Sequence, residues 1–141
     1  MSKYKNFLIL KLFLVSIFVL IPSFNNAKEI LLYADSISYD NEENIIAKGN
    51  AKIFQNNSFI TSDLIIYNKS LEKIILPSKF TLKDENNNYY QGENGFFSKN
   101  LKSAEFNNPK IRLNDGSRLI GSKIKRDQHI DIITKGVYTP C

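Results

Sequence analysis

The amino-acid sequence predicts an all-β domain in which a repeated unit builds a folded-over or two-layered sheet. From residue 28 onward, short runs that alternate apolar and polar residues are separated by turns rich in Asn, Asp and Gly. No window of this part keeps a clear helical period, and the nearest one, residues 70–76, is short. One strand-and-turn motif also returns at a near-constant interval, which is typical of repeat architectures.

The repeated motif is an acid, a short apolar strand with an aromatic residue, and a turn. Its first copy is Ala34-Asp35-Ser36-Ile37-Ser38-Tyr39-Asp40. The later copies cover residues 62–68, 92–98 and, more faintly, 121–127. The acid positions hold Asp35, Asp63, Glu93 and Ser122, at intervals of 28, 30 and 29 residues. One such unit cannot bury its apolar face alone, so the period predicts stacked units with a continuous interior.

The first 27 residues have the layout of a secretory signal peptide. Lys3 and Lys5 precede an apolar run at residues 12–21, and Ala27 offers a cleavage point before Lys28. The apolar stretch is shorter than the ~18–20 residues that span a bilayer. The residue three before the cleavage point is an asparagine, so an uncleaved anchor remains the alternative. We expect a signal peptide at 1–27, a β domain at 28–136 and a C-terminal tail at 137–141.

Turn residues divide the chain from residue 28 onward into the expected strands. They are expected at residues 29–39, 45–47, 51–54, 59–67, 74–76, 80–82, 89–97, 111–113, 119–125 and 130–133. Gly49-Asn50 predicts a bend or bulge between two of them. Pro77 suits the end of a strand or a sheet edge, because proline cannot donate to a central ladder.

Composition argues against nucleic-acid binding and against catalysis. Three of the 19 Lys and Arg residues precede residue 28, which leaves 16 scattered among 14 acids instead of a basic face. One histidine, His129, and one distant cysteine do not supply a zinc site. The acidic turn at 40–44 lacks the EF-hand pattern, and no phosphate-binding loop or nucleophile motif is present. We therefore expect no catalytic residues, no metal and no cofactor, and we expect the acids of the repeat to serve hydrogen bonding at turns and strand ends.

The repeated unit, followed by Ala47-Lys48-Gly49-Asn50-Ala51-Lys52-Ile53, resembles the OstA-like repeat of the lipopolysaccharide (LPS) transport proteins. The resemblance covers residues 30–141. The ending Gly136-Val137-Tyr138-Thr139-Pro140-Cys141 is similar to the segment after the periplasmic domain of LPS-assembly proteins of the LptD type. A soluble bridge of the LptA type is the second possibility within the family.

This resemblance implies a V-shaped β-jellyroll, open along one edge, which carries LPS across the periplasm in association with the outer membrane. Its implied partners are LPS acyl chains, other jellyroll domains that pair through edge strands, and an outer-membrane β-barrel. Inward-facing residues would contact the acyl chains, although alternating apolar residues of this kind are more often simply core. The candidates are Ile30, Leu32, Ile37, Tyr39, Ile53, Ile65, Tyr67, Phe80, Leu82, Ile111 and Leu113.

Cys141 is the only cysteine, so an exported chain would carry either an intermolecular disulfide or a free thiol there. In relatives of the LptD type, cysteines of the periplasmic domain pair with cysteines of the barrel. A chain that ends at Cys141 would not form that barrel itself. A different class of function also stays open, namely a structural repeat that assembles edge to edge, with a filled core and no lipid.

Overall fold

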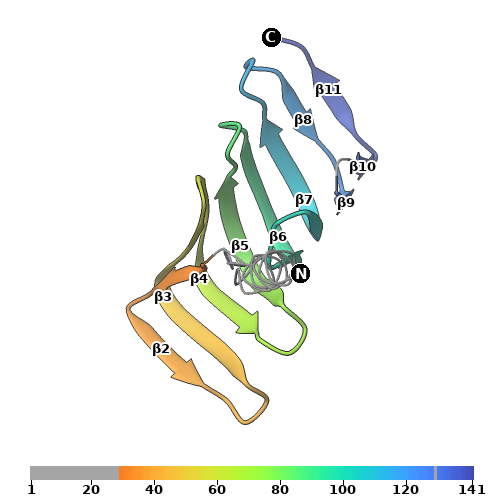
Figure 1. The fold of residues 1–141 in the computed structure, drawn as a ribbon. Coiled ribbons are helices and arrows are strands. Elements are labelled where there is room, and N and C mark those ends of the chain that lie inside the picture. The colour runs from red at the N-terminus through yellow and green to blue at the C-terminus, as the bar shows by residue number, and fades with distance from the viewer. Residues whose placement is uncertain (1–28, 129) are drawn as a thin grey trace, which may run out of the picture.

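The computed structural model describes residues 29–128 and 130–141, and these form one antiparallel sheet of 11 strands without a helix (Figure 1). The predicted all-β class is confirmed. The strands are β1 (Leu31–Tyr33), β2 (Ser36–Tyr39), β3 (Asn44–Gln55), β4 (Ser58–Asn68), β5 (Lys73–Lys83), β6 (Tyr89–Ser98), β7 (Ser103–Arg112), β8 (Arg118–Ile120), β9 (Lys123–Asp127), β10 (Ile130–Thr134) and β11 (Val137–Thr139). The expected signal peptide, its cleavage site at Ala27 and Lys28, and His129 lie outside the described residues.

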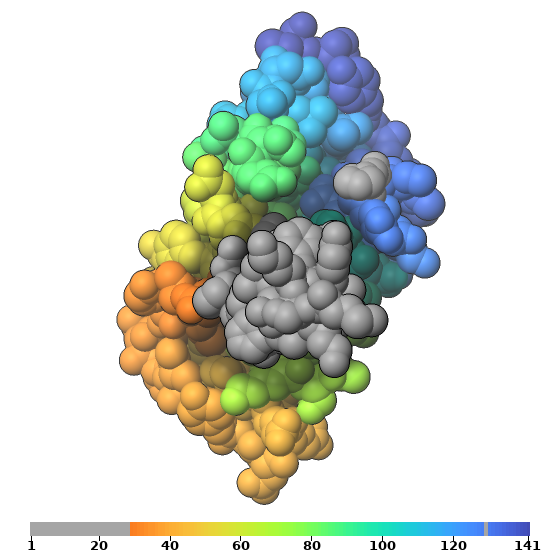
Figure 2. All heavy atoms as spheres, in the orientation of Figure 1, coloured from red at the N-terminus to blue at the C-terminus, as the bar shows by residue number. Residues whose placement is uncertain are grey.

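Five long strands, β3 to β7, form a meander in which each pairs with the next. At the first end of the sheet, β1 and β2 pair with different halves of β3. At the other end, β8 and β9 pair with different halves of β7 and are extended by β11 and β10. The two ends of the sheet, in orange and blue, lie at opposite ends of the body (Figures 1 and 2).

Each long strand therefore belongs to two layers. Wing A contains β1, β8, β11 and residues 51–55, 58–62, 79–83, 89–92 and 109–112. Wing B contains β2, β9, β10 and residues 44–48, 64–68, 73–76, 95–98 and 103–107.

A line of irregular backbone, here called the crease, separates the two wings. The register shifts there in β3, β4, β5 and β6. Five crease residues have a positive φ: Gly49, Asn50, Asn94, Asn108 and Lys135. The bulge predicted at Gly49-Asn50 is thus confirmed, and all four acid positions of the repeat, Asp35, Asp63, Glu93 and Ser122, fall on or beside this line.

Some predicted strand boundaries are wrong because the strands cross or end at the crease. Strand β5 continues through Pro77, because this residue lies in the crease, where the register shifts between Leu76 and Lys79. The single strand expected at 119–125 is divided into β8 and β9 at Gly121-Ser122. Strand β11 lies within residues 137–141 and pairs with β8.

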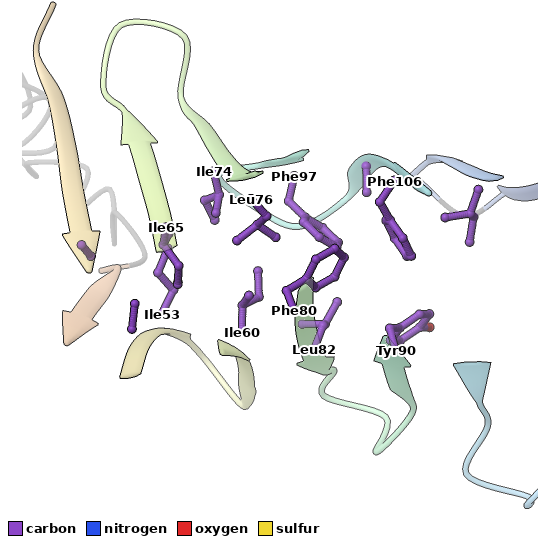
Figure 3. Close-up of a cluster of buried hydrophobic side chains, with 14 of the residues drawn as sticks. Ile53, Ile60, Ile65, Ile74, Leu76, Phe80, Leu82, Tyr90, Phe97 and Phe106 are labelled. Atoms are coloured by element: carbon purple, nitrogen blue, oxygen red, sulfur yellow. The ribbon is translucent and has the colours of Figure 1, made fainter. Parts of the chain in front are cut away.

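The core lies between the wings, whose inner faces pack directly on one another (Figure 3). The Phe80 ring of wing A meets two rings of wing B edge-on, with centroids 5.5 Å from Phe97 and 5.0 Å from Phe106. Fifteen hydrophobic residues, drawn from both wings, are at most 4% exposed. Within the described ranges, no helix has the length and apolar character needed to cross a membrane.

Candidate functional site

All eleven predicted acyl-chain residues lie on the inner face of the folded sheet. Directly paired residues of neighbouring strands share a face, so the register assigns nine of them. The other two, Ile30 and Leu113, are partly buried against the core. Five of them are buried in the core: Ile53, Ile65, Phe80, Leu82 and Ile111. Four are partly buried against it: Ile30, Leu32, Tyr67 and Leu113. The structure therefore brings nine of the eleven into one cluster.

The other two, Ile37 and Tyr39, stay accessible on the inner face of β2. They pair with Ala47 and Ile45 of β3, and they are 46% and 70% exposed. At the opposite end of the sheet, Tyr138 continues the inner face and is 57% exposed. The apolar interior thus reaches solvent at both ends of the stack.

Several inner-face residues escaped the sequence-based prediction. The largest of them are Ile60, Ile74, Leu76, Tyr90, Phe97, Phe106 and Ile124. Residues 59–67 were expected to alternate as one strand, which would place Ile60 opposite to Ile65. Across the crease β4 has one residue fewer than its partners β3 and β5, which breaks its alternation, so both side chains point inward. The bend or bulge expected at Gly49-Asn50 is a sequence signal of this line.

Pairs of polar residues hold the crease. The Asn50 amide donates a hydrogen bond of 2.9 Å to the Asp35 carboxylate, and the Asn108 amide donates to the Glu93 carboxylate. In both pairs the asparagine follows the acid by 15 residues, so the repeat supplies the same contact twice. Between them, the Ser62 hydroxyl donates to the Lys79 carbonyl oxygen at 2.8 Å. The Asp35 bond agrees with the hydrogen-bonding role expected for that acid of the repeat.

A polar clasp, made of Asp84, Tyr90, Arg126 and Asp131, ties the wings together on the side away from the crease. The Arg126 guanidinium of wing B lies 4.7 Å from the centroid of the Tyr90 ring of wing A. Two guanidinium nitrogens donate to the Asp131 carboxylate at 2.7 and 2.8 Å, and the Tyr90 hydroxyl donates to Asp84 at 3.1 Å.

Two groups of the clasp, Tyr90 and Arg126, have shifted pKa values. Burial raises the pKa of the Tyr90 hydroxyl above its ordinary value. Burial alone would lower the pKa of Arg126, but the Asp131 hydrogen bonds and the neighbouring Tyr90 raise it overall. Arg126 therefore stays a cation beside a neutral Tyr90 phenol throughout the physiological pH range.

A concave region with a volume of about 1040 Å³ lies on the outer face of wing A, beside the crease. Its lining includes Lys52, Lys79, Lys110, Asp63 and Glu93. Among the described residues, no group of three His, Cys, Asp or Glu side chains could hold a metal ion. The Cys141 thiol is exposed and unbonded within the described part of the chain.

Two wings folded along a crease, with an apolar interior and unpaired strands at both ends, define an edge-open β-jellyroll, as predicted. The same fold occurs in the crystal structure of LptH from Pseudomonas aeruginosa, described as the LptA-homologous periplasmic component of the conserved lipopolysaccharide transport device. The TM-score is 0.59 at 15% sequence identity, over 80% of this chain and 82% of that chain. At this identity the likeness establishes the fold. No family model matches the chain, and no curated protein matches it significantly.

Proposed function

We propose that the chain is a non-catalytic lipid-transport module that shields the acyl chains of LPS between its two wings. One observation carries the proposal. A continuous apolar inner face runs through the whole sheet and reaches solvent at both ends, at Ile37 and Tyr39 and at Tyr138. The LptH likeness supports it, because that protein is named as a component of an LPS transport device.

The physical need for such a groove follows from the size of the lipid. Each methylene kept out of water contributes about 0.8 kcal/mol, so one twelve-carbon chain would cost on the order of 10 kcal/mol to expose. In the present state the inner faces fill one another, with Phe80 against Phe97 and Phe106. Acyl chains would enter as the wings separate. Apolar contacts between wings would then be exchanged for apolar contacts with lipid, which limits the free-energy difference.

The proposed setting is the periplasm, in association with the outer membrane. Four strands have an unpaired edge in the described sheet, β1 and β2 at one end and β10 and β11 at the other. Such edges can accept a strand of a neighbouring jellyroll domain. The sequence at residues 136–141 favours a domain of the LptD type, in which Cys141 would pair with a cysteine outside this chain. A soluble bridge of the LptA type is the alternative.

Photo-crosslinking in cells that make LPS tests the proposal with matched positions on opposite faces. We expect a photoreactive residue at Tyr39 or Tyr67 to capture LPS, because both side chains face the interior. Their neighbours Ser38 and Ile66 point outward in the same strands and should capture much less. Equal capture at the inner and outer positions of a folded protein would refute the proposal.

The filled core favours a second candidate, a structural repeat that polymerises through its edges without lipid. Ile53, Ile65 and Ile74 are fully buried by contacts within the protein itself. In this case, LPS would not be captured at any of the four crosslinking positions, and the protein would form polymers in lipid-free buffer. Mass spectrometry with and without reductant would also show whether Cys141 acquires a disulfide partner.

A further inference from the structure

The outer face of wing A carries a set of positively charged side chains. A lipid groove between the wings does not require this charge. Residues that pair directly across neighbouring strands form two rows of outward-facing side chains on this face. One row runs from Leu31 in β1 to Thr139 in β11, and the other runs from Tyr33 in β1 to Val137 in β11. None of the side chains in these two rows, all within the described residues, is acidic. Five are cationic, and we call them the basic plate: Lys52, Lys83, Lys110, Arg112 and Arg118.

Aromatic side chains accompany the basic plate on the same face. Tyr33, Phe54 and Phe59 contact one another at the β1 end, with ring centroids 5.7 and 5.9 Å apart. Tyr33 is 56% exposed there. In the middle of the plate, Tyr89 lies under Lys83 and Arg112, which are 5.6 and 4.9 Å from its centroid. Aromatic rings beside Lys and Arg are typical of surfaces that meet lipid headgroups.

Six acids surround the basic plate without entering its two rows: Asp35, Asp63 and Glu93 at the crease, and Asp84, Glu85 and Asp115 in turns at the rim. Asp84 and Asp115 lie in turns at the rim, where each accepts hydrogen bonds from its own turn, and Glu85 is exposed beside Asp84. Asp63 and Glu93 lie at the crease, near Lys79 and Lys135.

The outer face of wing B is different. There Lys48, Lys73, Lys123 and Lys125 share the face with an apolar ladder of Ile46, Ile66, Ile75 and Phe96, and Lys123 forms an ion pair with Glu105. The two faces thus differ in that Glu105 and Asp127 lie among the cations of wing B, whereas no acid lies in the two rows of wing A.

We propose that the outer face of wing A docks on the surface of an anionic lipid bilayer. The basic plate would contact the lipid phosphates, and the cluster of Tyr33, Phe54 and Phe59 would enter the headgroup region. Charge complementarity supports this partner, because each Lys or Arg near an anionic membrane contributes to binding. This surface is separate from the apolar interior, so the docking does not depend on LPS in the groove.

Vesicle flotation of the full chain tests the docking, with vesicles of phosphatidylcholine alone or mixed with phosphatidylglycerol. The plate variant carries Lys83→Gln, Arg112→Gln and Arg118→Gln. The control variant carries Lys48→Gln, Lys123→Gln and Lys125→Gln, which remove the same charge from the outer face of wing B. Both variants keep residues 1–28, so any membrane affinity of that segment is common to all samples.

We expect the plate variant to bind anionic vesicles on the order of a hundredfold more weakly than the unmodified chain. The control variant should stay within about threefold of it, because its charges lie on the opposite wing. Thermal unfolding should be similar for all three proteins. Equal losses in the two variants, or equal binding of the unmodified chain to both kinds of vesicle, would overturn the proposal. Release by soluble glycerol phosphate would also overturn it, since the site would then be one for small anions.

Discussion

Two aspartates at the tips of opposite wings build the same turn. The Asp40 carboxylate accepts hydrogen bonds from the backbone NH groups of Glu42 and Asn44, both at 2.9 Å, and from the Asn44 amide at 2.7 Å. Asp84 accepts the equivalent three bonds from Asn86 and Asn88. These bonds hold the pKa of Asp40 below its ordinary value, chiefly through the Asn44 side chain. Short polar side chains thus set the register of both hairpins.

The fourth residue of each turn has a left-handed backbone, and the two turns have different residue types at this position. Glu43 has φ 60° and Asn87 has φ 63°. Asparagine tolerates this conformation better than glutamate does. We expect Glu43→Asn to stabilise the protein by about 0.5–1 kcal/mol, and the reverse change Asn87→Glu to destabilise it by a similar amount. Urea unfolding of both variants measures this, and shifts of the same sign would contradict it.

At the scale of elements, the glycines of β6 make room for an aromatic residue of β7. A Cβ atom at Gly92 would lie 2.7 Å from the Phe106 ring atom Cε2 and 3.1 Å from the Phe80 Cζ. A Cβ atom at Gly95 would instead lie 2.5 Å from the Glu105 carbonyl oxygen and 2.8 Å from the Phe106 Cα. The first obstacle is a side chain, and the second is backbone.

This difference predicts a double-mutant result. Gly92→Ala and Gly95→Ala should each destabilise the protein by about 1–3 kcal/mol, because both crowd a packed core. Adding Phe106→Leu should reduce the loss for Gly92→Ala but not for Gly95→Ala, since only the first clash is with a side chain. Thermal or urea unfolding of the single and double variants measures the coupling. Equal relief at both glycines would contradict this account of the β6–β7 contact.

The sequence was sufficient for the all-β class, for the bulge at Gly49-Asn50 and for the inward direction of the eleven candidate residues. It was not sufficient for the continuity of strands. A strand that crosses the crease looks interrupted in sequence, as at Pro77, because the residues that bend it are poor strand formers. Whether a bulge adds one residue depends on partners distant in the chain, so the inward direction of Ile60 could not be derived from local alternation.

At the scale of the molecule, the clasp adds to the closure that core packing already provides. Tyr90 and Arg126 come from different wings, on the side away from the crease. The Arg126 side chain is 14% exposed, so its ion pair with Asp131 is shielded from solvent more than a typical surface pair. The clasp therefore lies where the wings would first separate.

Arg126→Gln should accordingly destabilise the protein by about 1–2 kcal/mol, through loss of the ring contact and of the charged partner of Asp131. If lipid enters between the wings, the same change should increase LPS capture at Tyr67. Glu72→Gln, which removes the exposed ion pair with Lys99 within wing B, is the matched control and should change stability by less than about 0.5 kcal/mol. Urea unfolding and crosslinking yields measure the two effects. Similar changes in the two variants would show that the clasp has no special role in closure.

The meander has a consequence for how the chain folds. Since each strand from β4 to β7 pairs with the one made just before it, every new hairpin grows on an existing edge. Both layers advance together, because each long strand supplies one half to each of them. Loop closures stay short, and such topologies fold faster than sheets whose neighbours are distant in sequence. The protein can thus be assembled from its first strands to its last, in the order in which a chain leaves a ribosome or a translocation channel.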